Sequence, residues 1–558
     1  MPQSGTYLQL NAAFGSEDIY LTGNPQMTFF KSVYKKHTNF AMDTAKIKIP
    51  KSELKYTTTT TCKVKLDRNG DLANTVYIGL TLPAIFSNST YKFQWVKYIG
   101  NNIISKVGIY INGLKIDEQY GEWMLIWNEL NLTDDKKKIY YDLIGHTPEL
   151  YDPAHAYSRN GFYPDSALDA NDKLNYNKPP SIPEKVIYVP LNFWFCRNTG
   201  LALPLIALQT SLIEFEIEFQ PIYKLYTVLN SSGKRIQPDI SNNLHHIKNF
   251  LSETYYLPTP RLDIGDWDFK AHLEVTYIYL DKEERRLFAS KPHDYLIQTI
   301  TKITESNLNP GNINIKIKAS HPTTEIIIVG QRSDSLSRND YNNYTNWENN
   351  DKPPWQGTFL PEFNKIAGNI EISENSYWKA LEAGNTIRLK RDSVTGALVL
   401  EKYVISQYIE IGRFDTSYET NPALPSQIVN NPVSQTYVNN TKHIINKMNI
   451  LLDGNRKIDD DVGRDNEFFS KLQVYQHHKG NPLDGILIYS FAISPEDTLQ
   501  PSGYCNLTKI QNLLLQLKTV EPLKTNGVYN YKFNFNIYLI SYNIFSVLNG
   551  QGGLKFAT

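Results

Sequence analysis

The sequence predicts an all-β protein made of two consecutive β-sandwiches. Three observations support this prediction: apolar and polar residues alternate with a period of two in many segments, helical patterns are few and short, and two long polar stretches interrupt the strands in similar halves of the chain. Aromatic residues make up 12% of the 558 residues, and such residues favour strands. The length suits two sandwiches of about 200–250 residues each.

Alternating patterns mark individual strands. In residues 211–219, Glu214, Glu216 and Glu218 point to one side and apolar residues to the other, which is typical of a half-buried antiparallel strand. Residues 107–116 predict a hairpin, because Asn112-Gly113 supplies the two positive-φ residues of a type I′ turn. Further strands are predicted at 273–279, 313–317 and 529–539, and a second hairpin joins 387–390 to 397–400 through a turn at 391–396.

Two segments predict short helices. Residues 121–130 place Trp123, Trp127 and Leu130 on one helical face, and residues 281–289 are long enough for about two turns.

The long polar stretches at 133–184 and 331–385 are predicted to be loops, and loops of this length in a compact domain are functional or surface-forming. The chain divides near residues 281–292, which leaves strands, one long loop and more strands in each half.

Charge and cysteine content exclude several classes of protein. The 57 basic and 57 acidic residues cancel, which argues against a nucleic-acid coat protein because phosphate contacts need a basic excess. Cys62, Cys196 and Cys505 form no CxxC pair, so we expect no local zinc or redox motif and a reducing compartment. No secretory signal or convincing membrane span is visible, so we expect a soluble protein.

Common catalytic motifs are absent from the sequence, among them GxxxxGK[ST], GxGxxG, HExxH and GxSxG. The adjacent pairs His245-His246 and His477-His478 suggest metal ligation, but neighbours on a strand point to opposite faces, so we expect no chelation. The acidic run at 459–461 lacks calcium-loop spacing and is expected to be a solvated turn. The run at 283–286, Glu-Glu-Arg-Arg, is expected to be an exposed helical turn rather than a catalytic acid pair.

One alternative function is an enzyme that acts on glycans. Its candidate carboxylates are Asp117, Glu118 and Glu122, beside Trp123 and Trp127, and a glycosidase needs two carboxylates within about 5–9.5 Å of each other. The competing interpretation is that the first two acids end a hairpin while the tryptophans pack a helix inside the protein.

A second alternative is a carbohydrate-binding attachment protein, with Trp347 and Trp355 as stacking platforms and Tyr344 nearby. Packing of these loop aromatics on the loops themselves is the default. Six N-x-[ST] sequons are expected by chance in an Asn-rich chain: Asn88, Asn131, Asn230, Asn343, Asn439 and Asn506.

Five segments, ordered along the chain, carry a further pattern. They are IYLTGNPQMTFFK continuing to VYKKHTNF at 19–40, YIYLD through HDYLI at 277–297, HP followed by EI at 321–326, QVYQHH through PSGYCN at 473–506, and YN with GGL at 542–554. Together they resemble the major capsid proteins of nucleocytoplasmic large DNA viruses, over nearly the whole chain.

The resemblance implies two consecutive eight-stranded antiparallel jelly rolls with long inter-strand loops and few short helices. It implies an N-terminal arm at 1–45 that faces the capsid interior, a first jelly roll at 46–285, a linker at 286–292, and a second jelly roll at 293–558 with the C-terminal strand and tail. In this interpretation the linker charges fix the angle between the sandwiches, and Phe29, Phe30 and Val33 hold the arm on the base of the capsomer.

The same resemblance implies a structural protein and no enzyme. Three chains would form a homotrimer with six similar towers, a pseudo-hexameric capsomer of an icosahedral shell. The implied partners are the chain itself, neighbouring capsomers, minor capsid and penton proteins, and an inner membrane near the arm, without direct contact to nucleic acid. The implied location is the virion shell, after assembly in the host cytoplasm. We expect no catalytic residue, cofactor site or metal site.

Overall fold

The computed structural model describes residues 15–50, 54–87, 91–159, 161–164, 166, 179–229, 235–251, 267, 269–348, 441–456, 463–522, 524–525 and 528–556, and the backbone of five strand segments between 370 and 414.

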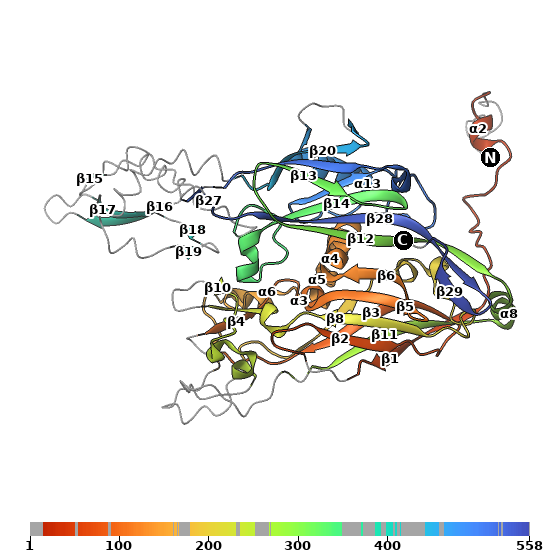
Figure 1. The fold of residues 1–558 in the computed structure, drawn as a ribbon, viewed down its shortest axis with the longest axis horizontal. Coiled ribbons are helices and arrows are strands. Elements are labelled where there is room, and N and C mark those ends of the chain that lie inside the picture. Colours follow the sequence, from red (N-terminus) through yellow and green to blue (C-terminus); the bar gives the residue numbers. More distant parts are fainter. Residues whose placement is uncertain are drawn as a thin grey trace, which may run out of the picture.

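The N-terminal half forms a sandwich of two four-stranded antiparallel sheets (Figure 1), with strand orders β1-β11-β3-β7 and β2-β8-β5-β6. The bounds of its strands are β1 (Phe40–Lys48), β2 (Thr60–Lys65), β3 (Leu72–Leu82), β5 (Ile104–Ile111), β6 (Leu114–Tyr120), β7 (Lys185–Pro190), β8 (Ile213–Phe219) and β11 (Ala271–Leu280).

The C-terminal half forms a second sandwich, with strand orders β12-β28-β14-β23 and β13-β25-β20-β21. The bounds of its strands are β12 (His293–Leu308), β13 (Asn312–Ile317), β14 (Pro322–Arg332), β20 (Ile445–Leu452), β21 (Asn455–Arg456), β23 (Ile486–Ser490), β25 (Leu513–Thr519) and β28 (Phe533–Leu548). Short strands extend its edges: β22 (Arg464–Asp465) pairs with β20, β24 (Cys505–Asn506) with β14, and β29 (Gln551–Leu554) with β28.

Both sandwiches have the same topology. When the eight main strands of each half are numbered along the chain, one sheet has the order 1-8-3-6 and the facing sheet 2-7-4-5. This is the double Greek-key arrangement of a jelly roll. The prediction of two consecutive eight-stranded jelly rolls is confirmed.

Minor strands and helices lie outside the two sandwiches. The strands are β4 (Lys92–Trp95), β9 (Tyr226–Leu229), β10 (Arg235–Ile236), β15 (Ile370–Glu371), β16 (Asn385–Arg391), β17 (Leu398–Ile405), β18 (Tyr408–Ile409), β19 (Arg413–Phe414), β26 (Lys524–Thr525) and β27 (Val528–Tyr529). The helices are α2 (Ile19–Thr22), α3 (Ile99–Ile103), α4 (Gly121–Asn131), α5 (Asp134–Leu143), α6 (Pro148–Tyr151), α7 (Trp194–Arg197), α8 (Lys282–Ser290) and α13 (Gln473–His477), which follows a π-helical turn at Phe468–Leu472.

Several strand predictions are confirmed by burial and register. β8 alternates buried and half-buried residues along its length, and β13 alternates exposed and buried ones. Asn112 and Gly113 have φ values of 52° and 80°, so the β5–β6 hairpin turns as its sequence predicts. Strands β16 and β17 pair as predicted, while their turn at 392–397 lies outside the described residues.

Two predictions need correction. The stretch at 133–184 is not one loop, because α5 and α6 lie in it. The last long strand begins at Phe533 rather than at residue 529, and it runs to Leu548.

The second jelly roll presents a sheet that is buried on both faces. In β14, Ile326 and Ile328 pack with the sheet that contains β13 and β25, whereas Ile327 and Val329 belong to the apolar cluster that fills the first jelly roll. All residues of β14 after Pro322 are buried. The two jelly rolls therefore share one continuous core.

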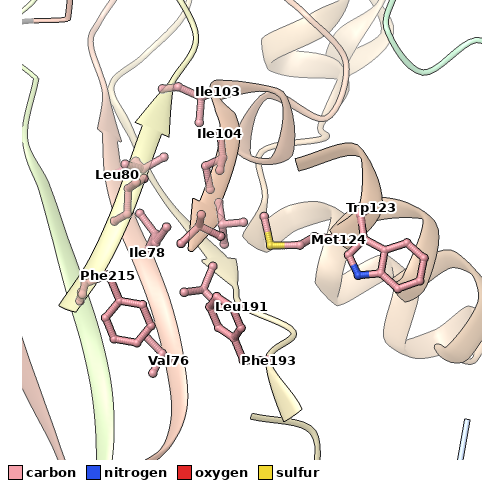
Figure 2. Packing of buried hydrophobic residues seen from close by; sticks show 14 of the residues in the cluster. Val76, Ile78, Leu80, Ile103, Ile104, Trp123, Met124, Leu191, Phe193 and Phe215 are labelled. Carbon is pink, nitrogen blue, oxygen red and sulfur yellow. The ribbon is translucent and has the colours of Figure 1, made fainter. Parts of the chain in front are cut away.

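Helices α3 and α4 lie between the two sandwiches (Figure 1). Trp123 and Met124 at the start of α4 point in opposite directions (Figure 2): Met124 faces Ile78 and Ile104 of the first jelly roll, and Trp123 points away from them. Residues 123–130 are all buried. The prediction of one apolar face was too narrow, because α4 has neighbours on every side.

The two ends of the molecule differ (Figure 1). Strands β15 to β19 project from one end, and α8 and β29 lie at the other. The described part of the N-terminal arm, residues 15–39, leaves the molecule near α8 and runs across this end toward the side of the second jelly roll, where α2 lies apart from the sheets. No helix among the described residues is long and apolar enough to cross a membrane.

Candidate functional site

The carboxylate at the start of α4 contacts the second jelly roll. Glu122 Oε2 accepts hydrogen bonds from Asn536 Nδ2 at 2.7 Å and from the Tyr538 hydroxyl, and Lys302 Nζ lies 3.4 Å from it. The buried ring of Trp123 lies 5.3 Å from the ring of Tyr538. With three donors on one oxygen, Glu122 joins the two jelly rolls and is not an open acid or base.

A buried carboxylate, Asp117, also lies at the contact between the two jelly rolls, which is here called the seam. Asp117 Oδ1 is 3.5 Å from the backbone nitrogen of Ile300 in β12. Burial raises the pKa of Asp117 to about 7, although the charge of Arg197 opposes this shift. Arg197 itself donates to Gln298 Oε1 at 3.0 Å and lies 4.2 Å from the ring centre of Trp127. These groups thus pack the seam instead of lining a cleft.

Glu118 lies away from the other two acids. It accepts a hydrogen bond from the Tyr120 hydroxyl at 2.8 Å, and the ammonium groups of Lys106 and Lys115 lie 3.9 and 3.7 Å from its carboxylate. It belongs to the polar face of the β2-β8-β5-β6 sheet, because its strand neighbours Asp117 and Gln119 are buried. The five residues of the enzyme hypothesis do not form one open site.

Residues 478–485, here called the strap, cross from the second jelly roll to α4. His478 Nε2 lies 2.7 Å from Glu325 Oε1 of β14, and both side chains are completely buried. Burial lowers the pKa of His478, but the charge and hydrogen bond of Glu325 outweigh this, so the net pKa is raised. Two residues on, the Gly480 backbone nitrogen donates to the Leu130 carbonyl at 2.7 Å.

The middle of the strap contacts a buried ion pair between α4 and α5. Lys137 Nζ of α5 donates to the Asn481 carbonyl and lies 3.0 Å from Glu129 Oε2 of α4. Burial raises the pKa of Glu129, while Lys137 and the Tyr141 hydroxyl oppose the shift. The strap therefore ties two buried carboxylates, Glu129 and Glu325, into one connection between the jelly rolls.

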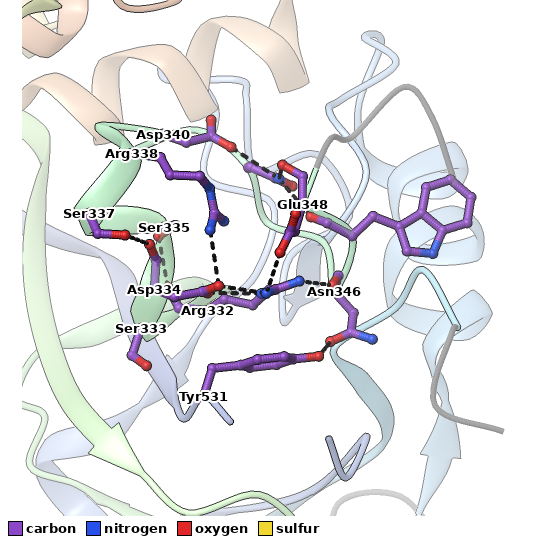
Figure 3. A network of polar contacts seen from close by, with 12 residues as sticks. Arg332, Ser333, Asp334, Ser335, Ser337, Arg338, Asp340, Asn346, Glu348 and Tyr531 are labelled. Atoms are coloured by element: carbon purple, nitrogen blue, oxygen red, sulfur yellow. Dashed lines mark hydrogen bonds and ion pairs between the residues drawn. The ribbon is translucent and has the colours of Figure 1, made fainter. Parts of the chain in front are cut away.

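A polar network fixes the segment after β14 (Figure 3). Arg332 donates through Nε and Nη2 to the two oxygens of Asp334 at 2.9 and 2.6 Å, and through Nη1 to the Asn346 carbonyl at 2.9 Å. Arg338 donates to Asp334 Oδ2 at 3.0 Å, and the guanidinium of Arg332 lies 3.9 Å from the ring centre of Tyr531. The carboxylate of Asp334 is thus held between two arginines.

This network continues into the first jelly roll. Asn339 Nδ2 donates to the carbonyls of Tyr223 and Tyr226 at 2.9 and 2.8 Å. Asn339 has φ 53°, a left-handed conformation that Asn tolerates better than most residues. The prediction of one loop at 331–385 is wrong, because β14 runs to Arg332 and a 3-10 helix follows at Ser333–Arg338, and the sequence did not predict this connection. The local signal for this network was the pair Arg332 and Asp334, two residues apart at the end of a long apolar strand.

The histidine pairs lie outside regular strands, so the strand argument used for them was wrong. His477 ends α13 with Nδ1 2.9 Å from the Ile493 carbonyl, and His478 belongs to the strap. His245 Nδ1 accepts from the Asp239 nitrogen at 3.1 Å, and His246 stacks on Tyr56 at 4.0 Å between ring centres. In the part of the chain that the structure describes, no three His, Cys, Asp or Glu residues gather as a metal site.

The charged run at 283–286 lies on α8, and none of the α8 residues is buried, as predicted. Arg285 Nε lies 3.0 Å from Asp71 Oδ1, and Asp71 Oδ2 also accepts from the Leu280 nitrogen at 2.9 Å. The helix thereby contacts the first jelly roll. The acidic run at 459–461 lies outside the described residues.

The residues of the carbohydrate-binding hypothesis fall into two groups, those that the structure describes and those that lie outside the described residues. Lys442 Nζ lies 5.0 Å from the ring centre of Trp347, and Tyr344 is buried. Asn343 is also buried, and its Nδ2 donates to the Trp347 carbonyl at 2.9 Å, so this sequon is inaccessible. Trp355 lies outside the described residues, and so do three sequons: Asn88, Asn230 and Asn439.

Comparison with known proteins identifies the family. Residues 28–281 match the family described as major capsid protein N-terminus, and residues 284–553 match the large eukaryotic DNA virus major capsid protein family. The major capsid protein of Phaeocystis pouchetii virus is 30% identical over 577 residues, which cover 99% of this chain and 100% of that protein. The chain belongs to the major capsid proteins of large eukaryotic DNA viruses.

Other relatives of this capsid protein agree. The major capsid protein of Chrysochromulina ericina virus is 28% identical and covers 99% of this chain and 100% of its own length. Among solved structures, PBCV-1 VP54 has a TM-score of 0.58 at 22% identity and covers 95% of this chain and 100% of its own. The Faustovirus major capsid protein has a TM-score of 0.58 at 12% identity, with 97% and 96% covered. These structures show the same fold.

Membership of this family decides between the functional hypotheses. The capsid protein is a structural component of a large DNA virus and not an enzyme. Its important contacts are those that position one jelly roll against the other. Asp117 and Glu122 were candidate catalytic carboxylates in the enzyme hypothesis. In the structure they connect the two jelly rolls of the capsid protein.

Proposed function

We propose that this capsid protein forms a homotrimer that acts as a pseudo-hexameric capsomer and tiles the icosahedral shell. The observation that supports this proposal is the joining of two jelly rolls of identical strand order into one block. Three copies around a three-fold axis present six similar sandwiches, and closed cyclic symmetry is the usual way for identical chains to assemble.

A capsomer of this kind needs a fixed angle between its two sandwiches, because a variable angle would change the outline of the six-membered ring. The shared core supplies part of the rigidity, since β14 and β28 contribute to the apolar clusters of both jelly rolls. Polar contacts between the jelly rolls also fix their relative orientation. They are made by Glu122 at the seam, by the strap and by Asn339. Together these contacts support a building block with one geometry.

The division of the chain is also a proposal. We place the arm at 1–45, the first jelly roll at 46–285, the linker at 286–292 and the second jelly roll at 293–558. β1 of the first jelly roll begins at Phe40, inside the proposed arm, and helix α8 begins before the linker and ends at Ser290, inside it. We further propose that the arm faces the capsid interior near minor capsid proteins and the inner membrane, that penton proteins and neighbouring capsomers contact the outer walls, and that the shell assembles in the host cytoplasm without direct nucleic-acid contact.

The mass of the purified protein in solution tests the trimer. One chain has a mass of 64.1 kDa, so light scattering after size exclusion should give about 192 kDa, unchanged on dilution. A stable dimer would contradict the proposal. A monomer that stays monomeric when co-expressed with the other proteins of the shell would also contradict it.

A further inference from the structure

The described arm is an exposed apolar segment. Six of its large side chains are at least 78% exposed: Tyr20, Leu21, Phe29, Phe30, Val33 and Tyr34. No residue of α2 is buried, and the hydrogen bonds given for residues 15–38 are local to the arm. A segment with this much exposed aromatic surface requires an apolar environment in its working state.

The charge of the arm selects the kind of environment. Between residues 19 and 42 the chain carries Lys31, Lys35 and Lys36 and no acidic residue, although acids and bases balance over the whole sequence. In an extended segment neighbouring side chains alternate between two sides. Residues 32–39 contain no turn, so Val33 and Lys35 share one side and Tyr34 and Lys36 the other, while Phe29 and Phe30 lie in the turn that precedes them. Whichever side faces a partner carries both apolar groups and positive charge.

This composition matches an anionic lipid surface. Aromatic side chains enter the boundary between headgroups and acyl chains, and lysines contact the negative headgroups, so binding by both requires no shape complementarity. A protein groove would instead need a regular apolar face, which residues 23–39 lack because they form neither helix nor strand.

The position of the arm fits the same partner. It leaves the molecule at the α8 end (Figure 1), and the eleven residues from Phe29 to Asn39 reach up to about 36 Å when extended. The end itself is partly apolar, with the exposed side chains of Leu287, Leu548 and Phe556. Its own charges are mixed, since α8 carries Glu283 and Glu284 beside its bases and Lys555 pairs with Asp294 at 3.6 Å, so the excess of positive charge belongs to the arm.

We infer that residues 19–39 bind directly to the surface of an anionic lipid bilayer, with Phe29 and Phe30 inserted and Lys31, Lys35 and Lys36 on the headgroups. The inference rests on the proposed function in one respect, since a trimer would present three arms on one side and gain affinity from their multivalency.

Vesicle sedimentation of the full chain tests the inference. The protein should pellet with phosphatidylcholine vesicles that contain about one-third phosphatidylserine, and binding should fall with added salt. Phe29→Ser with Phe30→Ser should reduce the affinity at least about tenfold. Lys31→Gln, Lys35→Gln and Lys36→Gln together should reduce it similarly, and only on the anionic vesicles.

Two matched variants serve as controls. Phe162→Ser with Tyr475→Ser removes two exposed aromatic residues from the body of the protein, at 79% and 87% exposure, and should bind like the wild type. Lys316→Gln, Lys318→Gln and Lys518→Gln remove the same charge from exposed positions in β13, directly after it and in β25, and should also have no effect.

Several results would overturn the inference. They are undiminished binding after deletion of residues 1–38, equal binding to vesicles of phosphatidylcholine alone, and no binding to either vesicle by protein whose arm is intact. The last result, combined with capture of another shell protein by the arm, would assign it to a protein partner. Light scattering on the same samples separates the two proposals, because a monomer that binds anionic vesicles through its arm contradicts only the trimer.

Discussion

At the scale of single residues, the buried carboxyl group of Asp117 shows how the seam responds to pH. Its ordinary pKa is 3.8, and burial in the folded protein raises it to about 7. Folding therefore favours the protonated form. The stability gained from that proton is fully present below about pH 4, and it is lost as the pH rises through 7.

We expect Asp117→Asn to remove this pH dependence, because the amide stays neutral and keeps an oxygen for the Ile300 nitrogen. In urea unfolding, the variant should match the wild type near pH 4 and exceed its free energy of unfolding by about 1–3 kcal/mol at pH 8. Glu283→Gln, on the exposed face of α8, is the control and should show no such divergence. A constant difference at every pH would contradict the prediction.

At the scale of elements, the strap contacts the end of α4 through a close approach of two backbones at Gly480. A Cβ atom on Gly480 would lie closer than 3.0 Å to the carbonyl oxygens of Glu129 and Leu130, at the end of α4. Gly480→Ala should therefore push the strap away from α4, and we expect a loss of about 1–3 kcal/mol in the free energy of unfolding.

Hydrogen exchange should show the loss of protection concentrated at residues 478–485 and at the end of α4. Gly553→Ala is the matched control, because nothing lies within 4 Å of a Cβ at that position. Equal destabilisation by the two substitutions would show that the strap does not need the close approach.

Sequence patterns predicted the strands well where one face of the strand is exposed to solvent. The alternation in β8 and the Asn112-Gly113 turn specify local structure completely, because side-chain direction and backbone φ are local properties. Helix α5 was missed because its sequence, DDKKKIYYDL, has almost no apolar periodicity and only Lys137 and Tyr140 are buried.

The seam was missed for a different reason. Its contacts join residues far apart in the chain, such as Glu122 with Tyr538 and Glu325 with His478. One local signal was present: Ile326-Ile327-Ile328-Val329 is a continuous apolar run instead of an alternating one, and this is typical of a strand buried on both faces. The run predicts a second layer over β14 without saying which segment supplies it.

At the scale of the whole molecule, the shared core predicts cooperative unfolding. Trp123 is completely buried between the jelly rolls and contacts Tyr538. Calorimetry of the wild type should show a single transition, because exposure of either jelly roll removes apolar contacts from the other. Trp123→Leu should leave a cavity at the seam and separate the transition into two.

Trp95→Leu is the matched control for this experiment. Trp95 is also almost completely buried, but its ring neighbours are Phe93 and Trp267, both in the N-terminal half of the chain and away from the seam with the second jelly roll. This variant should lower the transition temperature and keep a single transition. Two resolved transitions in the wild type would mean that the two jelly rolls are thermodynamically independent despite their shared core.

The arm continues directly into β1, and β1 pairs with β11 through nine consecutive antiparallel residue pairs, from Phe40 with Leu280 to Lys48 with His272. A mechanical pull on the arm along the strand axis therefore acts on this ladder in shear. All nine pairs resist together, whereas a pull across the strands would open them one after another. A shell held from inside through its arms would thus transmit tension into this nine-pair ladder of each subunit.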